Sequence, residues 1–165
     1  MKKEKAICFT GHRPNNLPWR SYECGEQFNN FKANLRNVIV GNIQKGYKYF
    51  LSGMAMGFDL IAAKVILELK EEYDIKLIAV LPYSNHGKNW NMQDKIRHDE
   101  ILKNADDIIV LNEEYNKYVF FDRNKYMVEN SSKVIACYNN IKGGTLNTIK
   151  FALKHGREVE YVSLG

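Results

Sequence analysis

Short apolar runs alternate with longer amphipathic segments along the chain. Runs rich in Val, Ile, Leu and Phe predict β-strands at residues 6–9, 49–51, 76–81, 107–111, 134–137 and 158–162. Between most of them, apolar residues recur at helical spacing, which predicts helices at residues 26–44, 59–71, 93–103, 122–130 and 146–154. Strands and helices therefore follow one another in turn, and this order is typical of α/β proteins.

The predicted strands contain few polar residues, which is typical of strands covered on both faces. Repeated strand–helix–strand units predict a three-layer Rossmann-like α/β fold with a mostly parallel sheet of about six strands. No repeat or linker divides the sequence, so we expect a single domain over residues 1–165. The polar segment at residues 83–91 is long enough to be a functional loop.

Composition narrows the class of protein. The 165 residues are 45% hydrophobic and 26% charged, as is usual for a globular protein. No apolar run approaches the roughly 20 residues that span a bilayer, and the charged N-terminus is followed only by a short strand-like run, too little for a signal peptide. We therefore expect a cytoplasmic protein without a membrane partner.

The cysteines and histidines do not suggest a metal or redox site. Cys8 and Cys137 lie within predicted strands, so small buried hydrophobic side chains are favoured over a catalytic thiol. Cys24 completes no Cys-x-x-Cys pair, and the four histidines have no metal-ligand spacing. No metal is expected.

The net charge of +5 suits an anionic ligand. The basic residues are dispersed, however, and most have acidic neighbours on the predicted helices. A solvated surface explains them about as well as a nucleic-acid interface does, so nucleic acid is not the favoured partner.

Unusual residues gather after the predicted strands, and open α/β sheets bind ligands beyond the carboxyl ends of their strands. Residues 10–14, Thr-Gly-His-Arg-Pro, follow the first strand. Gly11 permits a close backbone approach, and Arg13 offers a planar fork of donors to phosphate or carboxylate. A turn with a solvated arginine is the alternative.

The segment after the second strand, residues 52–59, carries two glycines four positions apart and leads into a helix. Such a loop can direct backbone N–H groups at an anion. It lacks the third glycine of the dinucleotide fingerprint and the Lys-Ser/Thr pair of a Walker motif, so no cofactor is expected. Asp59 either caps the helix or receives a ribose hydroxyl.

Two further clusters follow later in the chain. Arg123, Met127 and Asn130 share one face if residues 122–130 are helical, although a surface helix with incidental polar residues is the alternative. Residues 143–148, Gly-Gly-Thr-Leu-Asn-Thr, lie at a predicted helix N-terminus and are a good phosphate cradle. Trp90 either covers a bound base by stacking or packs its loop down.

The candidate ligand-binding residues are Gly11, His12, Arg13, Ser52, Gly53, Met54, Gly57, Asp59, Pro82, Trp90, Arg123, Asn124, Met127, Asn130, Gly143, Gly144, Thr145 and Thr148.

Four of these segments together resemble the YpsA-like branch of the SLOG superfamily, a Rossmann-like group named for its similarity to the LOG cytokinin-activating enzymes. Residues 9–14 with 17–19 resemble the opening motif, residues 52–63 the second, and residues 123–128 and 143–145 the third and fourth. The resemblance covers nearly the whole chain. It implies a homo-oligomer, most simply a dimer.

The superfamily includes phosphoribohydrolases that cleave nucleoside monophosphates, the DNA-processing protein DprA, and domains thought to sense nucleotide-derived signals. The LOG enzymes carry an arginine-led helix motif and a Gly-Gly loop that ends in a catalytic glutamate. The residues that match the spacing of the first motif are Arg123, Met127, Asn130 and Ser131. The loop at residues 143–151 contains no carboxylate. Since general acid–base help contributes ~10²–10⁴-fold, much hydrolytic power would be lost unless Glu100 or Glu129 substitutes.

We therefore expect a protein that binds a nucleotide or nucleotide-derived small molecule, as a sensor or sequestering protein. The alternative is a phosphoribohydrolase that cleaves the N-glycosidic bond of nucleoside monophosphates, with Arg123 as a catalytic residue. A second alternative is a DprA-like DNA-binding accessory protein. The dispersed charge disfavours it, although Trp19, Trp90 and several tyrosines can stack on bases.

Overall fold

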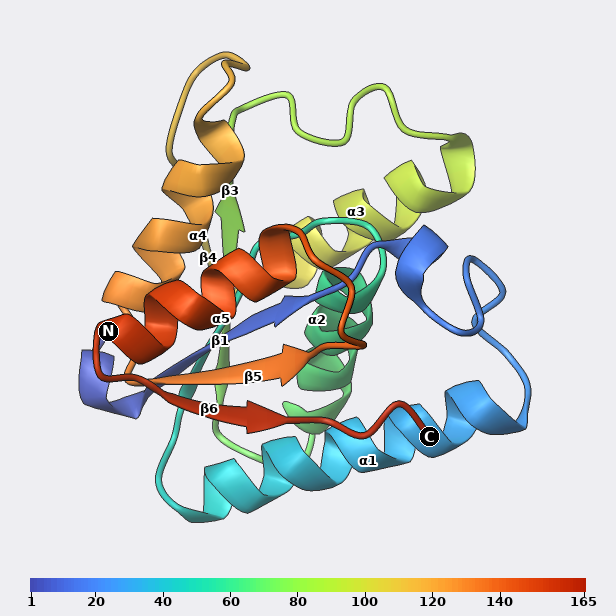
Figure 1. Cartoon of the computed structure of the whole chain (residues 1–165), viewed down its shortest axis with the longest axis vertical. Coiled ribbons are helices and arrows are strands. Elements are labelled where there is room, and N and C mark those ends of the chain that lie inside the picture. The colour runs from blue at the N-terminus through green and yellow to red at the C-terminus, as the bar shows by residue number, and fades with distance from the viewer.

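The computed structural model describes residues 1–165 and consists of one sheet with helices on both sides (Figure 1). The strands are β1 (Ala6–Gly11), β2 (Tyr49–Ser52), β3 (Lys76–Leu81), β4 (Asp107–Val110), β5 (Lys133–Cys137) and β6 (Glu158–Tyr161). The α-helices are α1 (Glu26–Gln44), α2 (Phe58–Leu69), α3 (Met92–Asn104), α4 (Val119–Glu129) and α5 (Gly144–Lys154). The predicted three-layer α/β fold is confirmed.

All neighbouring strands of the sheet run parallel, in the order β4-β3-β2-β1-β5-β6. The chain builds outward from β1 to β4 on one side and then returns to place β5 on the other side of β1. The strand order therefore reverses between β1 and β5. In open α/β sheets, a crevice forms beyond the carboxyl ends of the strands at such a point.

The alternation of side chains along the strands divides the core into two layers. Ile7 and Phe9 of β1 join the larger apolar cluster, which also holds the buried faces of α1 and α2. Ala6 and Cys8 join a smaller cluster with buried residues of α4 and α5. This is the expected consequence of successive strand side chains pointing to opposite faces.

Not every strand is buried on both faces. In β4, Ile108 and Val110 are 44% and 46% exposed, and β6 has no buried residue. Both are edge strands. The apolar pattern of β4 did not distinguish it from the central strands, whereas β6, with the sequence Glu-Val-Glu-Tyr, alternates charged and apolar residues. The expectation of full burial holds only for the strands between them.

The element boundaries agree with the sequence pattern most closely for α1 and β3. Helix α4 begins three residues before the predicted start, at Val119, and ends at Glu129. Asn130 therefore caps the helix rather than belonging to it, and its side-chain amide donates to the Tyr126 carbonyl.

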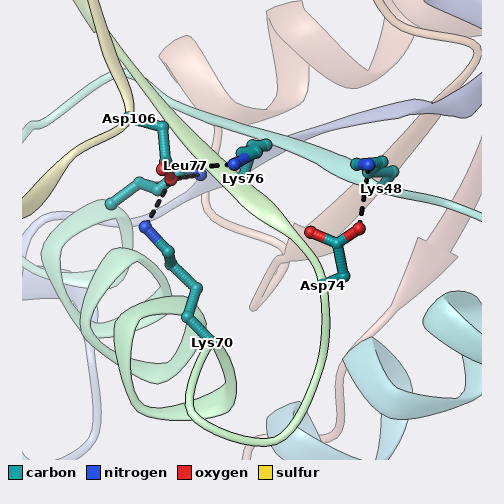
Figure 2. A network of polar contacts seen from close by, with 6 residues as sticks. All are labelled: Lys48, Lys70, Asp74, Lys76, Leu77 and Asp106. Atoms are coloured by element: carbon teal, nitrogen blue, oxygen red, sulfur yellow. Dashed lines mark hydrogen bonds and ion pairs between the residues drawn. The ribbon is translucent and has the colours of Figure 1, made fainter.

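Ion pairs tie together the amino ends of the strands, at the edge of the sheet opposite the crevice (Figure 2). Asp106, just before β4, accepts from Lys70 Nζ at 2.6 Å and from the Leu77 amide of β3 at 2.8 Å. Lys48, just before β2, pairs with Asp74 at 3.1 Å. None of the helices is long and apolar enough to cross a bilayer.

Candidate functional site

A cavity of about 240 Å³ lies at the carboxyl ends of β1 and β5. It is lined by the end of β1 and the turn after it, by the start of α2, by one face of α4 and by the loop that enters α5. The lining residues are Phe9, Thr10, Gly11, His12, Arg13, Asn16, Ala55, Asp59, Phe120, Arg123, Asn124, Met127, Lys142, Gly143, Gly144 and Thr145. The crevice expected from the reversal of strand order is therefore present.

The turn after β1 packs closely against α2. A Cβ atom at Gly11 would lie 2.3 Å from the Phe58 ring, so only glycine fits there without displacing the first residue of α2. His12 is buried, and its Nε2 accepts a hydrogen bond from the Asn139 amide at 3.1 Å. Burial lowers the pKa of His12. A neutral imidazole thus joins the loops that follow β1 and β5.

Two guanidinium groups lie at the Phe120 ring. The guanidinium carbon of Arg13 is 5.2 Å from the ring centroid, and that of Arg123 is 5.4 Å from it. Contacts of this kind are favourable cation–π interactions. Arg13 is exposed, whereas Arg123 is buried, and burial lowers the pKa of its guanidinium.

Hydrogen bonds fix the position of Arg123. Its Nη1 donates to the Gly53 carbonyl at 3.1 Å, and its Nε and Nη2 donate to Asn124 Oδ1, both at 3.2 Å. Three of its five N–H groups are used in this way, which leaves two for a ligand.

Asp59 brings a carboxylate to the cavity wall. It is the second residue of α2, it is buried, and its Oδ2 accepts a hydrogen bond from the Ala55 amide at 3.2 Å. Burial raises the pKa of Asp59, while the charges of Arg123 and Arg13 act in the opposite direction. The cap position of α2 belongs to Gly57, so Asp59 is not the N-cap.

The loop between β2 and α2 differs from the anion-binding loop that its glycines suggested. The Met54 amide donates to Ser52 Oγ, and the Phe58 amide donates to the His12 carbonyl. With the Ala55 amide bonded to Asp59, three N–H groups of this segment are used within the protein. The loop therefore places a carboxylate at the cavity, and these three amides are not available to an anion.

The N-terminus of α5 does face the cavity. Gly143 has φ +152°, which favours glycine, and no side chain caps the helix. The N–H groups of a first helical turn have no partner within the helix, and the helix dipole adds partial positive charge there. Lys142 lies beside this turn in the cavity lining.

The charged side chains of the lining give the cavity a positive balance. Arg13, Arg123 and Lys142 carry three positive charges, against the single carboxylate of Asp59. Together with the α5 N-terminus, this arrangement favours an anionic ligand.

Residues 7–163 match the sequence model of YpsA, described as the YspA SLOG family. The chain belongs to this family. The four glycine- and arginine-containing segments that resemble the YpsA-like branch all lie within the matched range, and each of them contributes residues to the cavity lining.

Similar proteins from bacteria fit this assignment. The chain is 31% identical over 137 residues to the SPbeta prophage-derived protein YoqJ of Bacillus subtilis, covering 74% of this chain and 80% of YoqJ. It is 27% identical over 160 residues to a UPF0398 protein of Bacillus thuringiensis, covering 94% of this chain and 86% of the relative.

Two solved structures share the fold. DNA processing protein A of Streptococcus pneumoniae superimposes with a TM-score of 0.66 at 23% identity, covering 96% of this chain and 50% of that chain. DNA processing protein A of Helicobacter pylori, whose structure concerns single-stranded DNA binding, has a TM-score of 0.64 at 20% identity and is covered to 65%. This YpsA-family chain thus spans half to two thirds of their length.

The structure brings together most of the residues that the sequence singled out. Those that line the cavity are Gly11, His12, Arg13, Asp59, Arg123, Asn124, Met127, Gly143, Gly144 and Thr145. Ser52, Gly53, Met54 and Gly57 lie behind the cavity wall and shape the loop that holds Asp59 and Arg123.

The remaining candidates lie elsewhere. Trp90 packs against His86 and His98, each with ring centroids 5.0 Å away, and Pro82 is buried at the end of β3. The Asn130 side chain donates to the Tyr126 carbonyl of its own helix, and the hydroxyl of Thr148 donates to the Gly144 carbonyl.

Sequence reasoning missed Phe120, Asn16 and Lys142. Phe120 lies one helical turn before Asn124, so its helical spacing is a signal that could have found it. Glu100 and Glu129, the suggested substitutes for the absent LOG glutamate, are exposed and do not line the cavity. The carboxylate that does line it is Asp59. Cys8 and Cys137 are buried with pKa values raised to about 12 by burial, which confirms the prediction of small buried side chains.

Proposed function

We propose that this protein binds a nucleotide or nucleotide-derived small molecule through its phosphate and ribose, as a sensor or sequestering protein. The observation that carries the proposal is the cavity at the α5 N-terminus, in which three cationic side chains face one carboxylate. A phosphate group supplies the negative charge that this balance favours.

The position of each group suggests how such a ligand is held. The phosphate lies against the first turn of α5, where Lys142 and the exposed Arg13 can reach it. The ribose lies deeper, where Asp59 accepts from a hydroxyl and the two unused N–H groups of Arg123 donate. Because these groups belong to α2, α4 and α5, one ligand contacts both layers of helices.

Binding assays with variants of exposed cavity residues test the proposal. We expect isothermal calorimetry to detect binding of ribose 5-phosphate and of AMP. Arg13→Ala and Lys142→Ala should each weaken it about 5- to 30-fold, because each removes one charge-assisted contact. Arg36→Ala is the control: Arg36 lies on α1 and pairs with Glu72 on the surface, so its loss should leave binding unchanged. Absence of heat with all phosphorylated ligands would overturn the proposal.

The same titration separates the small-molecule role from DNA binding. A single-stranded thymidine oligonucleotide should bind weakly, if at all, at 150 mM salt. Tight binding with a steep loss on raising the salt concentration would indicate phosphate-backbone contacts and favour a nucleic-acid role instead.

Phosphoribohydrolase activity is the second candidate, and the buried carboxylate of Asp59 favours it. Burial raises the pKa of Asp59 toward the range in which a carboxylate accepts a proton effectively. In such a reaction water attacks the ribose C1′, Asp59 accepts a proton from the water, and the base leaves with its bonding electrons and takes up a proton. Chromatography of AMP and UMP incubations should then detect free base.

Three carboxylate variants decide between binding and turnover. If turnover occurs, Asp59→Asn should lower it at least 100-fold, whereas Glu100→Gln and Glu129→Gln should not change it. No release of base at high protein concentration, together with measurable binding, would leave the sensor or sequestering role.

A further inference from the structure

A second hollow, between α4 and α5, lies next to the cavity described above. We call it the α4–α5 groove; its volume is about 210 Å³, and its lining residues are Phe120, Phe121, Asn124, Lys125, Gly144, Asn147, Thr148 and Phe151. Phe120, Asn124 and Gly144 line both hollows. The groove and the cavity are therefore adjacent and share a wall.

The two hollows differ in chemistry. The cavity is lined by cations, amides and a carboxylate, whereas the groove presents the rings of Phe120, Phe121 and Phe151. Phe121 is 61% exposed, an unusual position for so large an apolar side chain. Phe151 is held by the His155 ring, whose centroid is 4.0 Å from its own.

The size of the cavity also argues for a second compartment. Pockets that bury whole ligands usually measure roughly 300–1,000 Å³, and the cavity of about 240 Å³ lies below that range. It suits the phosphate and sugar of a nucleotide better than the complete molecule. The groove adds a compartment of similar size with flat apolar walls.

We propose that the α4–α5 groove holds the aromatic base of the nucleotide whose phosphate lies at the α5 N-terminus. This inference rests on the proposed function. The base stacks on Phe121 and Phe151, and the ribose passes Phe120 and Gly144, the wall that the two hollows share. Stacking on phenylalanine accepts any base, because every base has a flat π-face.

Asn124 stands at the junction of the two hollows. Its Oδ1 accepts from Arg123, whereas its Nδ2 makes no hydrogen bond within the protein. This leaves one donor group for the ribose or for the edge of the base. The hydroxyl of Thr148 is already bonded to the Gly144 carbonyl, so Asn147 and Lys125 are the other polar side chains in the groove able to bond a base edge.

The surrounding charge favours this occupant over a second copy of the chain. Helix α5 carries the exposed Lys150 and Lys154 and no acidic residue, whereas Lys125 on the α4 side is paired with Glu129 at 3.8 Å. The α5 side of the groove is therefore positive, which favours an anionic nucleotide. Two copies meeting through the same face would instead bring like charges together.

A comparison of ligands with and without a base tests the inference. Calorimetry should show that AMP binds the full chain at least fivefold more tightly than ribose 5-phosphate. Phe121→Ala should remove about five- to tenfold of the AMP affinity, the lower part of the range for base–aromatic stacking. The same variant should leave ribose 5-phosphate affinity within twofold of the original. Leu153→Ala is the matched control, because Leu153 is 55% exposed on α5 but lies outside the groove.

The outcomes are distinguishable. If ribose 5-phosphate and AMP both fail to bind, the proposed function itself is overturned. If both bind equally, or Phe121→Ala weakens both equally, the phosphate site stands and the base subsite is overturned. Sedimentation velocity of the same variants completes the test. A change of oligomeric state in Phe121→Ala without a change in the preference for AMP would identify the groove as a subunit contact and overturn the inference.

Discussion

His86 occupies an environment that disfavours its charged form. It is buried among Tyr83, Trp90, His98 and Phe120, and its Nδ1 has no hydrogen-bond partner. Burial, followed by the positive charges of Arg123, His98 and Arg13, lowers its pKa to about 3. The folded protein therefore keeps a neutral imidazole here at all ordinary pH values.

Because His86 stays neutral in the folded protein, we expect the protein to lose stability in acid. An unfolded histidine takes up a proton near pH 6.5, whereas folded His86 does not until about pH 3, so the unfolded state binds more protons between these values. The free energy of unfolding should fall by about 1.4 kcal/mol per pH unit from this residue as the pH drops below 6.5. Urea unfolding at pH 7.0, 6.0 and 5.0 measures the slope. His86→Phe should lower this slope by about 1.4 kcal/mol per pH unit, because the residue that takes up the proton on unfolding is gone. An unchanged slope in His86→Phe would contradict the explanation.

Gly57 shows how a single backbone position supports the site. Its φ is +91°, and a Cβ atom there would lie 2.6 Å from the His12 carbonyl oxygen. We expect Gly57→Ala to lower the free energy of unfolding by about 2 kcal/mol, because strain and a backbone clash act together. Gly41, inside α1, has open space around it, and Gly41→Ala should instead raise stability by about 0.5–1 kcal/mol. Chemical denaturation of the pair checks both signs, and a neutral Gly57→Ala would be the contrary result.

The segments that connect the strands differ in how firmly they are anchored. Figure 2 shows two aspartates at the amino ends of neighbouring strands: Asp106 pairs with Lys70 and Lys76, and Asp74 pairs with Lys48. Asp106 also accepts from the Leu77 amide, and its side chain is 22% exposed. Asp74 bonds Lys48 alone and is 82% exposed. Hydrogen bonds that satisfy backbone amides contribute more than ion pairs in water do.

Replacing these two aspartates should therefore have unequal effects. Asp106→Ala should cost about 1–3 kcal/mol, since it leaves the Leu77 amide and Lys70 without a partner. Asp74→Ala should cost less than about 0.5 kcal/mol. Thermal unfolding of both variants in one buffer measures the difference. A similar loss of stability in both variants would mean that the hydrogen bond from the Leu77 amide to Asp106 does not stabilise the junction of β3 and β4.

The exposed edge of the sheet affects the molecule as a whole. Ile108 and Val110 leave nearly half of their surface exposed on β4, and no further strand pairs with its free edge. Unprotected apolar edge strands promote association of chains. Lysine at both positions should lower concentration-dependent self-association, measured by static light scattering, while ligand binding remains the same. Unchanged scattering would show that β4 takes no part in association. The dimer implied by the family resemblance stays a prediction.

Local pattern accounted for much of the molecule because strands and helices follow short-range periodicity. The strand at residues 76–81 and the helix at residues 26–44 agree with β3 and α1 residue for residue. The loops after β1 and before α5 were also found, since glycines and hydroxyl residues at a helix N-terminus are visible in sequence. The exposure of β4 could not be predicted, because the apolar sequence of this edge strand resembles that of a central strand.

The amino-acid sequence alone was thus sufficient to predict the α/β class, the family and most of the residues around the cavity. Contacts between distant segments were decided by folding. Arg123 meets Gly53, 70 positions away, only because α4 packs against the sheet at β3, next to the loop that follows β2. Folding also brings the Phe120 ring close to both Arg13 and Arg123, which lie 110 positions apart in the sequence. The physical reason is that strand order and helix packing set these distances, whereas periodicity reports only which neighbours along the chain share a face.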